Sequence, residues 1–209
     1  YWETLGPIDS QQGKLNAYVR LVDHDGNVWG QVDRLILAGL WRANRWLPGY
    51  FLRDEYKLPI DPATPPGDYH FEVGLYDFET GQSFGVAKAI GAVKLTPPVK
   101  LPQPDHLTGV TALAQPINTA LALAGHTYAD AQLPPGGEIA GKIFWQATAP
   151  ITQSYHLQFS FVGPDRKRYV VAENLPLSAS YAVEQWRKSE IVGQAYRFHL
   201  PAVAPPGEY

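Results

Sequence analysis

Apolar and polar residues alternate in short runs along most of this chain. In residues 15–23 nearly every second residue is apolar, a period typical of a β-strand with one buried face. Asp25 and Gly26 separate this run from a second one at residues 27–33. An Asp-Gly step between two alternating runs predicts a β-hairpin.

The same pattern recurs, punctuated by the 19 Gly and 19 Pro residues of the chain. We predict further strands at 51–60, 69–78, 83–89, 92–95, 118–128, 139–147, 155–162 and 168–173. The one helix predicted is short, at 178–188, with Ser178 as its N-cap. Short strands joined by Gly/Pro turns are typical of antiparallel β-sandwiches of the immunoglobulin-like kind.

The sequence also repeats. Residues 46–69 align without a gap on residues 186–209, and residues 1–9 align on residues 144–152. This period is far longer than the roughly 20–50 residues of a solenoid repeat, so it indicates a duplicated domain. Four prolines within residues 97–106 are typical of a semi-rigid linker. We therefore predict an all-β fold with two tandem immunoglobulin-like sandwich modules, at 1–96 and 107–209, joined by a linker at 97–106.

Each module is expected to lack strands. The first copy opens at Tyr1, whereas about 36 residues precede the matching strand of the second copy. Conversely, the first copy continues past residue 69 to Leu95, and the second stops at that position. Open sheet edges are templates for further pairing. The expected partners are neighbouring domains of the same polypeptide or a second chain, and residues 107–128 are the segment most free to pair elsewhere.

Composition and charge argue against several classes of function. The net charge is −3 and no basic cluster exceeds residues 166–168, so nucleic acid is not an expected partner. No run approaches the roughly 18 apolar residues that cross a membrane, so membrane insertion is not expected. Cysteine is absent, and the six histidines show no zinc-ligand spacing. We expect no metal and no cofactor.

We also expect no catalytic residues and no enzyme activity in this chain. It carries no GxSxG motif and no phosphate-binding glycine-rich loop. Asp54 and Glu55 are neighbours on one predicted strand, so they point to opposite faces. Their counterparts in the second copy are Gln194 and Ala195, so the duplicated module does not require two carboxylates there.

The aromatic residues fall into two groups. Strand alternation predicts a set of buried core residues, namely Trp2, Trp145, Val19, Leu21, Phe159 and Phe161. Trp29 instead shares the polar face with Asp33, and its counterpart is Tyr169; Trp41 lies in an irregular segment, with Tyr181 as its counterpart. Such residues could stack on a sugar, form a domain interface, or pack under a neighbouring loop. Our candidate ligand-binding residues are Trp29, Trp41, Asp33, Tyr169 and Tyr181.

Four sequence motifs carry a resemblance: LVDHDGNVWGQVD, the WLPG turn, RDEYKLPIDPATPPGDY and HFEVGLYDFETGQ. Together they resemble a β-sandwich module appended to polytopic bacterial membrane proteins, whose best-known hosts are dolichyl-phosphate-mannose-type glycosyltransferases. The resemblance covers most of residues 1–95 and weakens in the second copy, where Gly163 replaces Asp23 and Arg166 replaces Gly26. It implies an extracytoplasmic location in a membrane-anchored parent and assigns no catalytic residue.

These observations favour a non-catalytic accessory region of a larger bacterial membrane-associated protein such as a glycosyltransferase, acting in spacing, docking or presentation. The second interpretation is a carbohydrate-binding module that uses exposed aromatic residues to bind glycan. The third is a glycan-acting enzyme with its cleft between the modules.

Overall fold

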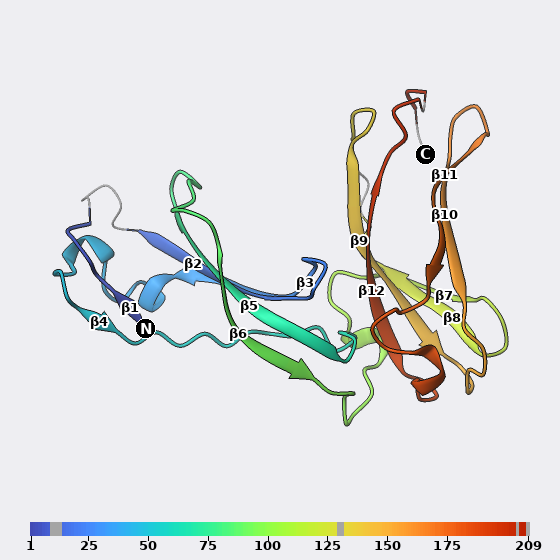
Figure 1. Ribbon diagram of the computed structural model, residues 1–209, viewed down its shortest axis with the longest axis horizontal. Coiled ribbons are helices and arrows are strands. Elements are labelled where there is room, and N and C mark those ends of the chain that lie inside the picture. The colour runs from blue at the N-terminus through green and yellow to red at the C-terminus, as the bar shows by residue number, and fades with distance from the viewer. Residues whose placement is uncertain (9–13, 129–131, 204, 208–209) are drawn as a thin grey trace. The chain divides into compact units, whose positions relative to one another are not determined.

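The computed structural model describes residues 1–8, 14–128, 132–203 and 205–207. The fold is all-β with antiparallel sheets, which confirms the predicted all-β class (Figure 1). The described residues are helical only in short 3₁₀ turns, at Ile36–Gly39, Ala43–Arg45, Pro104–His106 and Val183–Gln185. The chain forms two compact units. Unit 1 contains Tyr1–Asp61 and Asp68–Leu95, and unit 2 contains Pro62–Gly67 and Thr96–Tyr209.

Unit 1 has a four-stranded sheet in the order β3-β2-β5-β6 and a two-stranded sheet, β1-β4. The bounds are β1 (Trp2–Glu3), β2 (Leu15–Val22), β3 (Val28–Leu35), β4 (Phe51–Leu52), β5 (Gly67–Asp77) and β6 (Lys88–Leu95). The hairpin predicted from Asp25 and Gly26 is present: β2 pairs with β3, and Gly26 takes the left-handed conformation (φ 80°) that glycine adopts without strain. Apolar side chains between the two sheets form the core of this unit, around Ala17, Ile36, Ala43 and Trp46.

Unit 2 has a four-stranded sheet in the order β12-β9-β8-β7 and the hairpin β10-β11 (Figure 1). The bounds are β7 (Thr111–Pro116), β8 (Leu121–His126), β9 (Glu138–Ala147), β10 (His156–Val162), β11 (Arg168–Pro176) and β12 (Ile191–His199). Residues 107–128, expected to pair elsewhere, instead supply two strands of this sheet. That expectation is wrong because β8 pairs directly with β9 in its own unit.

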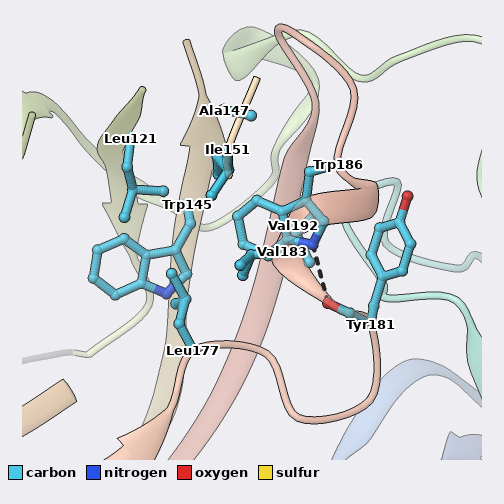
Figure 2. Packing of buried hydrophobic residues seen from close by; sticks show 9 residues of the cluster. All are labelled: Leu121, Trp145, Ala147, Ile151, Leu177, Tyr181, Val183, Trp186 and Val192. Atoms are coloured by element: carbon cyan, nitrogen blue, oxygen red, sulfur yellow. Dashed lines mark hydrogen bonds between the residues drawn. The ribbon is translucent and has the colours of Figure 1, made fainter. Parts of the chain in front are cut away.

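The main core of unit 2 is assembled around Trp145 and Trp186. Figure 2 shows these indoles among aliphatic side chains from the sheet and the loops, including Leu121 from β8 and Val192 from β12. Half-buried Leu157 of β10 packs against the same cluster. The core therefore lies between the sheet and the β10-β11 hairpin, as in a two-layer β structure.

The two copies agree in strand register. In the first copy Trp2 pairs with Leu52. In the second copy Trp145 pairs with Val192, and these are the residues that the sequence alignment matches. The duplicated sequence therefore specifies the same backbone pairing twice.

The irregular connection that precedes β4 in the first copy and β12 in the second contains the same hydrogen bond. The indole Nε1 of Trp46 donates to the Trp41 carbonyl oxygen at 3.3 Å, and that of Trp186 donates to the Tyr181 carbonyl oxygen at 3.1 Å (Figure 2). Both tryptophans are buried. Because a buried indole N–H requires an acceptor, this bond fixes the irregular connection in each copy.

Two of the six predicted core residues, Leu21 and Trp145, are buried, at 0% and 7% exposure. The other four are only half-buried: Trp2, Val19, Phe159 and Phe161. Phe159 and Phe161 lie on β10, which has one neighbour, β11, but Val19 is half-buried on β2, which lies between β3 and β5. Alternation therefore overestimates burial in both settings.

Several predicted elements are wrong in extent. The strand predicted at 51–60 is paired only at Phe51–Leu52, and the rest is extended chain outside any ladder. The strands predicted at 83–89 and 92–95 are one strand, β6, which begins at Lys88; before it Ser83 forms an isolated bridge to Tyr76. The strand predicted at 118–128 begins only at Leu121, after a bend, and ends at His126. The helix predicted at 178–188 is a single 3₁₀ turn, because Ser178 adopts φ 57° and its N–H donates to the Gln194 side chain instead of starting a helix.

Candidate functional site

Trp29 does not lie on an exposed face. It is 3% exposed, so the prediction that its ring is available for stacking is wrong. The register shows why: Leu21 pairs with Gly30 and Val22 pairs with Val28. Trp29 is thus the extra residue of a β-bulge, which breaks the alternation of side chains along the strand.

The Trp29 ring is fixed by the hairpin turn that precedes it. Its indole Nε1 donates to Asp23 Oδ2 at 2.8 Å. Asp23 also accepts the backbone N–H groups of Asp25 and Asn27, at 3.0 and 2.8 Å. Gly30, the next residue after Trp29, lies against the extended chain that follows β4. A Cβ added at Gly30 would come within 2.5 Å of the Pro59 carbonyl oxygen. Asp23 and Trp29 are therefore structural residues of the hairpin.

The other predicted ligand-binding residues contact different neighbours and do not form one site. Trp41 is 39% exposed and its ring packs against Tyr50, with centroids 5.5 Å apart. Its counterpart Tyr181 is buried, and its hydroxyl donates to the Gln185 carbonyl oxygen. Because the module buries this position in its second copy, exposure here belongs to the first copy alone.

Asp33 and Tyr169 are held by neighbours within their own units. Asp33 accepts hydrogen bonds from Asn16 Nδ2 at 3.0 Å and from the Tyr76 hydroxyl at 2.9 Å. The Tyr169 hydroxyl donates to Asp165 Oδ2 at 3.0 Å. Of the predicted site residues, Trp41 is therefore the one aromatic ring that combines an irregular segment with substantial exposure.

The polar cluster around Asp54 was not predicted as a site. The Asp54 side chain is 4% exposed and accepts Arg34 Nη2 at 2.6 Å. It also accepts the Tyr56 hydroxyl at 2.8 Å, the Leu37 N–H at 2.9 Å and Trp2 Nε1 at 3.3 Å. These donors come from three parts of the chain, namely Trp2, residues 34–37 and Tyr56 two residues after Asp54, so no single local motif signals the cluster.

Electrostatics keep Asp54 ionised. Burial alone would raise its pKa, but the hydrogen bonds from the Leu37 N–H, Arg34 and Tyr56 outweigh it and lower the pKa below the ordinary value. Burial and the neighbouring carboxylate raise the pKa of Tyr56, so the phenol stays protonated and donates. The Arg34 guanidinium lies over the Tyr56 ring, 4.1 Å from its centroid. A carboxylate held in this state is not suited to act as a general acid.

A shallow depression of about 420 Å³ adjoins the cluster. It is lined by Arg34, Leu37, Ala38, Leu40, Arg53, Asp54 and Glu55. Leu37 and Ala38 have positive φ angles of 52° and 53°, an uncommon conformation for residues other than glycine. Arg34 is paired with Asp54, and Arg53 is paired with Glu55. The charges of the depression therefore neutralise one another.

The second copy shows what the Asp54 position does. Its counterpart, Gln194, accepts the Ser178 N–H at 3.0 Å and donates to the Pro176 carbonyl oxygen at 3.1 Å. In both copies the side chain at this position accepts a backbone N–H from a segment with left-handed residues. That segment follows β3 in the first copy and β11 in the second. An amide performs this task in place of a carboxylate, so the shared role is structural.

No protein-family model, curated protein or solved structure matches the chain. Within the described ranges, no group of three or more His, Cys, Asp and Glu side chains is arranged to hold a metal ion. The helical turns found in those ranges all fall short of the length and apolar content that crossing a bilayer requires.

Proposed function

We propose that this chain is a non-catalytic spacing and docking region built from two immunoglobulin-like modules. The observation that carries the proposal is the contrast between kept and changed residues in the two copies. The scaffold bonds are kept, as at Trp46 and Trp186. The chemically distinctive side chains change, since Asp54 becomes Gln194 and the exposed Trp41 becomes the buried Tyr181.

The resemblance of residues 1–95 to modules of bacterial membrane glycosyltransferases supports an extracytoplasmic location in a membrane-anchored parent. An accessory module of that kind needs a stable sandwich and surfaces for neighbours rather than a reactive centre. The ionised, fully engaged Asp54 is consistent with this role, because a reactive carboxylate would need a free oxygen.

A second candidate function is carbohydrate binding at the Trp41–Tyr50 pair. The half-exposed indole beside a second ring, 5.5 Å away, favours it. Aromatic faces of this kind can stack on the apolar side of a sugar. The site would exist in the first copy only.

A glycan array followed by tryptophan-fluorescence titration separates the two functions. The spacing role predicts no glycan-dependent change in fluorescence and no hydrolysis of glycosidic substrates. Saturable quenching that disappears in Trp41→Ala would favour the carbohydrate-binding function. Trp186→Phe serves as the control, because Trp186 is the matching buried tryptophan of unit 2 and makes no bond to the segment that carries Trp41.

A further inference from the structure

The β3–β4 connection, residues 36–50, differs in charge from its counterpart in the second copy, residues 176–190. It contains two arginines, Arg42 and Arg45, and no Asp, Glu or Lys. Its counterpart contains two acidic and two basic residues. The first connection therefore carries a net charge of +2 in a chain whose net charge is −3, whereas the second is neutral.

The β3–β4 connection also exposes large apolar side chains. Leu40 is 90% exposed, Leu47 is 58% exposed and Trp41 is 39% exposed. The counterparts of Leu40 and Leu47 in the second copy are polar, Ser180 and Arg187. Exposed apolar side chains that gather in one segment indicate a surface for a partner.

These positions are exposed in both copies of the module, since Ser180 and Arg187 also face solvent. Unit 2 contains strands β7 and β8, which precede the shared part of the module, and unit 1 contains strands β5 and β6, which follow it. The strands on either side of the connection therefore leave positions 40 and 47 in solvent.

A 3₁₀ turn places the two arginines together. The Arg45 N–H donates to the Arg42 carbonyl oxygen at 3.1 Å, and residues three apart in such a turn lie above one another. Ala43 and Trp46, also three apart, are buried on the other side. Arg42 and Arg45 are exposed. Within the described part of the chain neither forms an ion pair, whereas Arg34 is paired with Asp54.

A second turn fixes the apolar side chains. The Tyr50 N–H donates to the Leu47 carbonyl oxygen at 3.1 Å, and Gly49 takes a φ of 85°, as a tight turn of this kind requires. The Trp41 ring packs against Tyr50 with centroids 5.5 Å apart, so the segment with Trp41 lies beside the turn that presents Leu47. A preformed surface binds without a large ordering cost.

This surface suits a lipid layer better than a folded protein. A stable protein–protein contact covers about 800 Å² on each partner, more than three side chains offer. The headgroup region of a bilayer takes up each apolar side chain separately and favours Trp at its boundary. Anionic headgroups also attract arginine, at about 1 kcal/mol for each residue near the surface.

We propose that the β3–β4 connection of unit 1 docks on an anionic lipid surface. Leu40, Trp41 and Leu47 lie between the headgroups, and Arg42 and Arg45 contact the phosphates. The contact is made by side chains and requires no spanning element. The neutral, polar connection of unit 2 takes no part. The inference names a partner for the docking role proposed above and rests on it.

The test is binding of the full chain to vesicles at about 0.1 M salt, where charges more than about 10 Å apart are largely screened. One set of vesicles contains phosphatidylglycerol and phosphatidylcholine in equal amounts, and the other contains phosphatidylcholine alone. Flotation should show binding about tenfold or more tighter to the anionic set. Brominated acyl chains should quench tryptophan fluorescence, and Trp41→Phe should float with the vesicles but lose the quenching.

Two further variants separate the apolar and the charged contribution. Leu40→Asp, and Arg42→Gln combined with Arg45→Gln, should each weaken binding to the anionic vesicles about tenfold. Ser180→Asp is the matched control at the equivalent position of unit 2 and should bind like the wild type. Circular dichroism verifies that each variant is folded.

Two results overturn the inference: no flotation with anionic vesicles up to about 5 mM lipid, or a Leu40→Asp chain that binds like the wild type. Quenching of Trp41 by a glycan without vesicle binding also overturns it and assigns the surface to carbohydrate. A failure to bind vesicles leaves the spacing role to its own glycan and hydrolysis assays.

Discussion

The two copies of the module keep the same framework and stabilise it with different chemistry. In the first copy a buried carboxylate, Asp54, ties the left-handed segment to the extended chain; in the second copy Gln194 does so. Conversely, the second copy has a buried charge where the first has an aromatic ring. Glu190 is 1% exposed and pairs with Arg187, whereas its counterpart is Tyr50. The comparison teaches that a hydrogen bond is kept at the Asp54/Gln194 position, whereas the Tyr50/Glu190 position holds a packed ring in one copy and a paired charge in the other.

The largest expected effect is at the paired tryptophans. Trp145→Ala should lower the free energy of unfolding by about 3–5 kcal/mol, because it empties a buried site in the main core of unit 2. Trp2→Ala should cost less, about 2 kcal/mol, because Trp2 is half-buried. Urea unfolding followed by circular dichroism measures both. A cost below about 1 kcal/mol for Trp145→Ala would contradict its place in the core.

The Arg187–Glu190 ion pair, in which the carboxylate is buried and the guanidinium is half-exposed, should give the next largest difference between the copies. Arg187→Ala should cost about 3 kcal/mol, because Glu190 would stay buried without the guanidinium that contacts it at 3.1 Å. The matched control is Leu47→Ala at the equivalent position. Leu47 is exposed, so the change should stay within about 0.5 kcal/mol. Equal effects of the two substitutions in urea titrations would break the comparison.

A smaller, pH-dependent effect should distinguish Asp54 from Gln194. Asp54→Asn should cost about 1–3 kcal/mol at neutral pH, through the loss of charged hydrogen bonds. The pKa of Asp54 is lower in the folded state, so its contribution is present above the unfolded value of about 3.9 and is lost as pH falls through the folded value. Stability measured from pH 7 down to about pH 2 should therefore fall less steeply in the variant. Asp25→Asn, on the exposed hairpin turn, is the control; a matching change there would show that the acid response has another source.

Sequence patterns predicted much of the fold and little of the polar structure. Alternation located strands such as β2 and β9, each of which lies inside a sheet with a paired neighbour on both sides. It failed at Trp29, since a one-residue bulge changes the face without changing the composition. It also failed at 51–60, where the chain is extended but pairs only at its start. The Asp54 cluster could not be predicted, because its donors meet only after folding.

The segment Pro62–Gly67 has a consequence for dissecting the protein. Unit 2 is discontinuous in sequence, since Pro62–Gly67 belongs to it while the chain on both sides belongs to unit 1. A protease that cuts near residue 96 would not release an intact second unit. The fragment from 96 onward would lose Ala63 and bare Phe144 and Ile191 to water. Such a fragment should bind a hydrophobic dye and precipitate more readily than the uncut chain, although every strand of its sheet is still present.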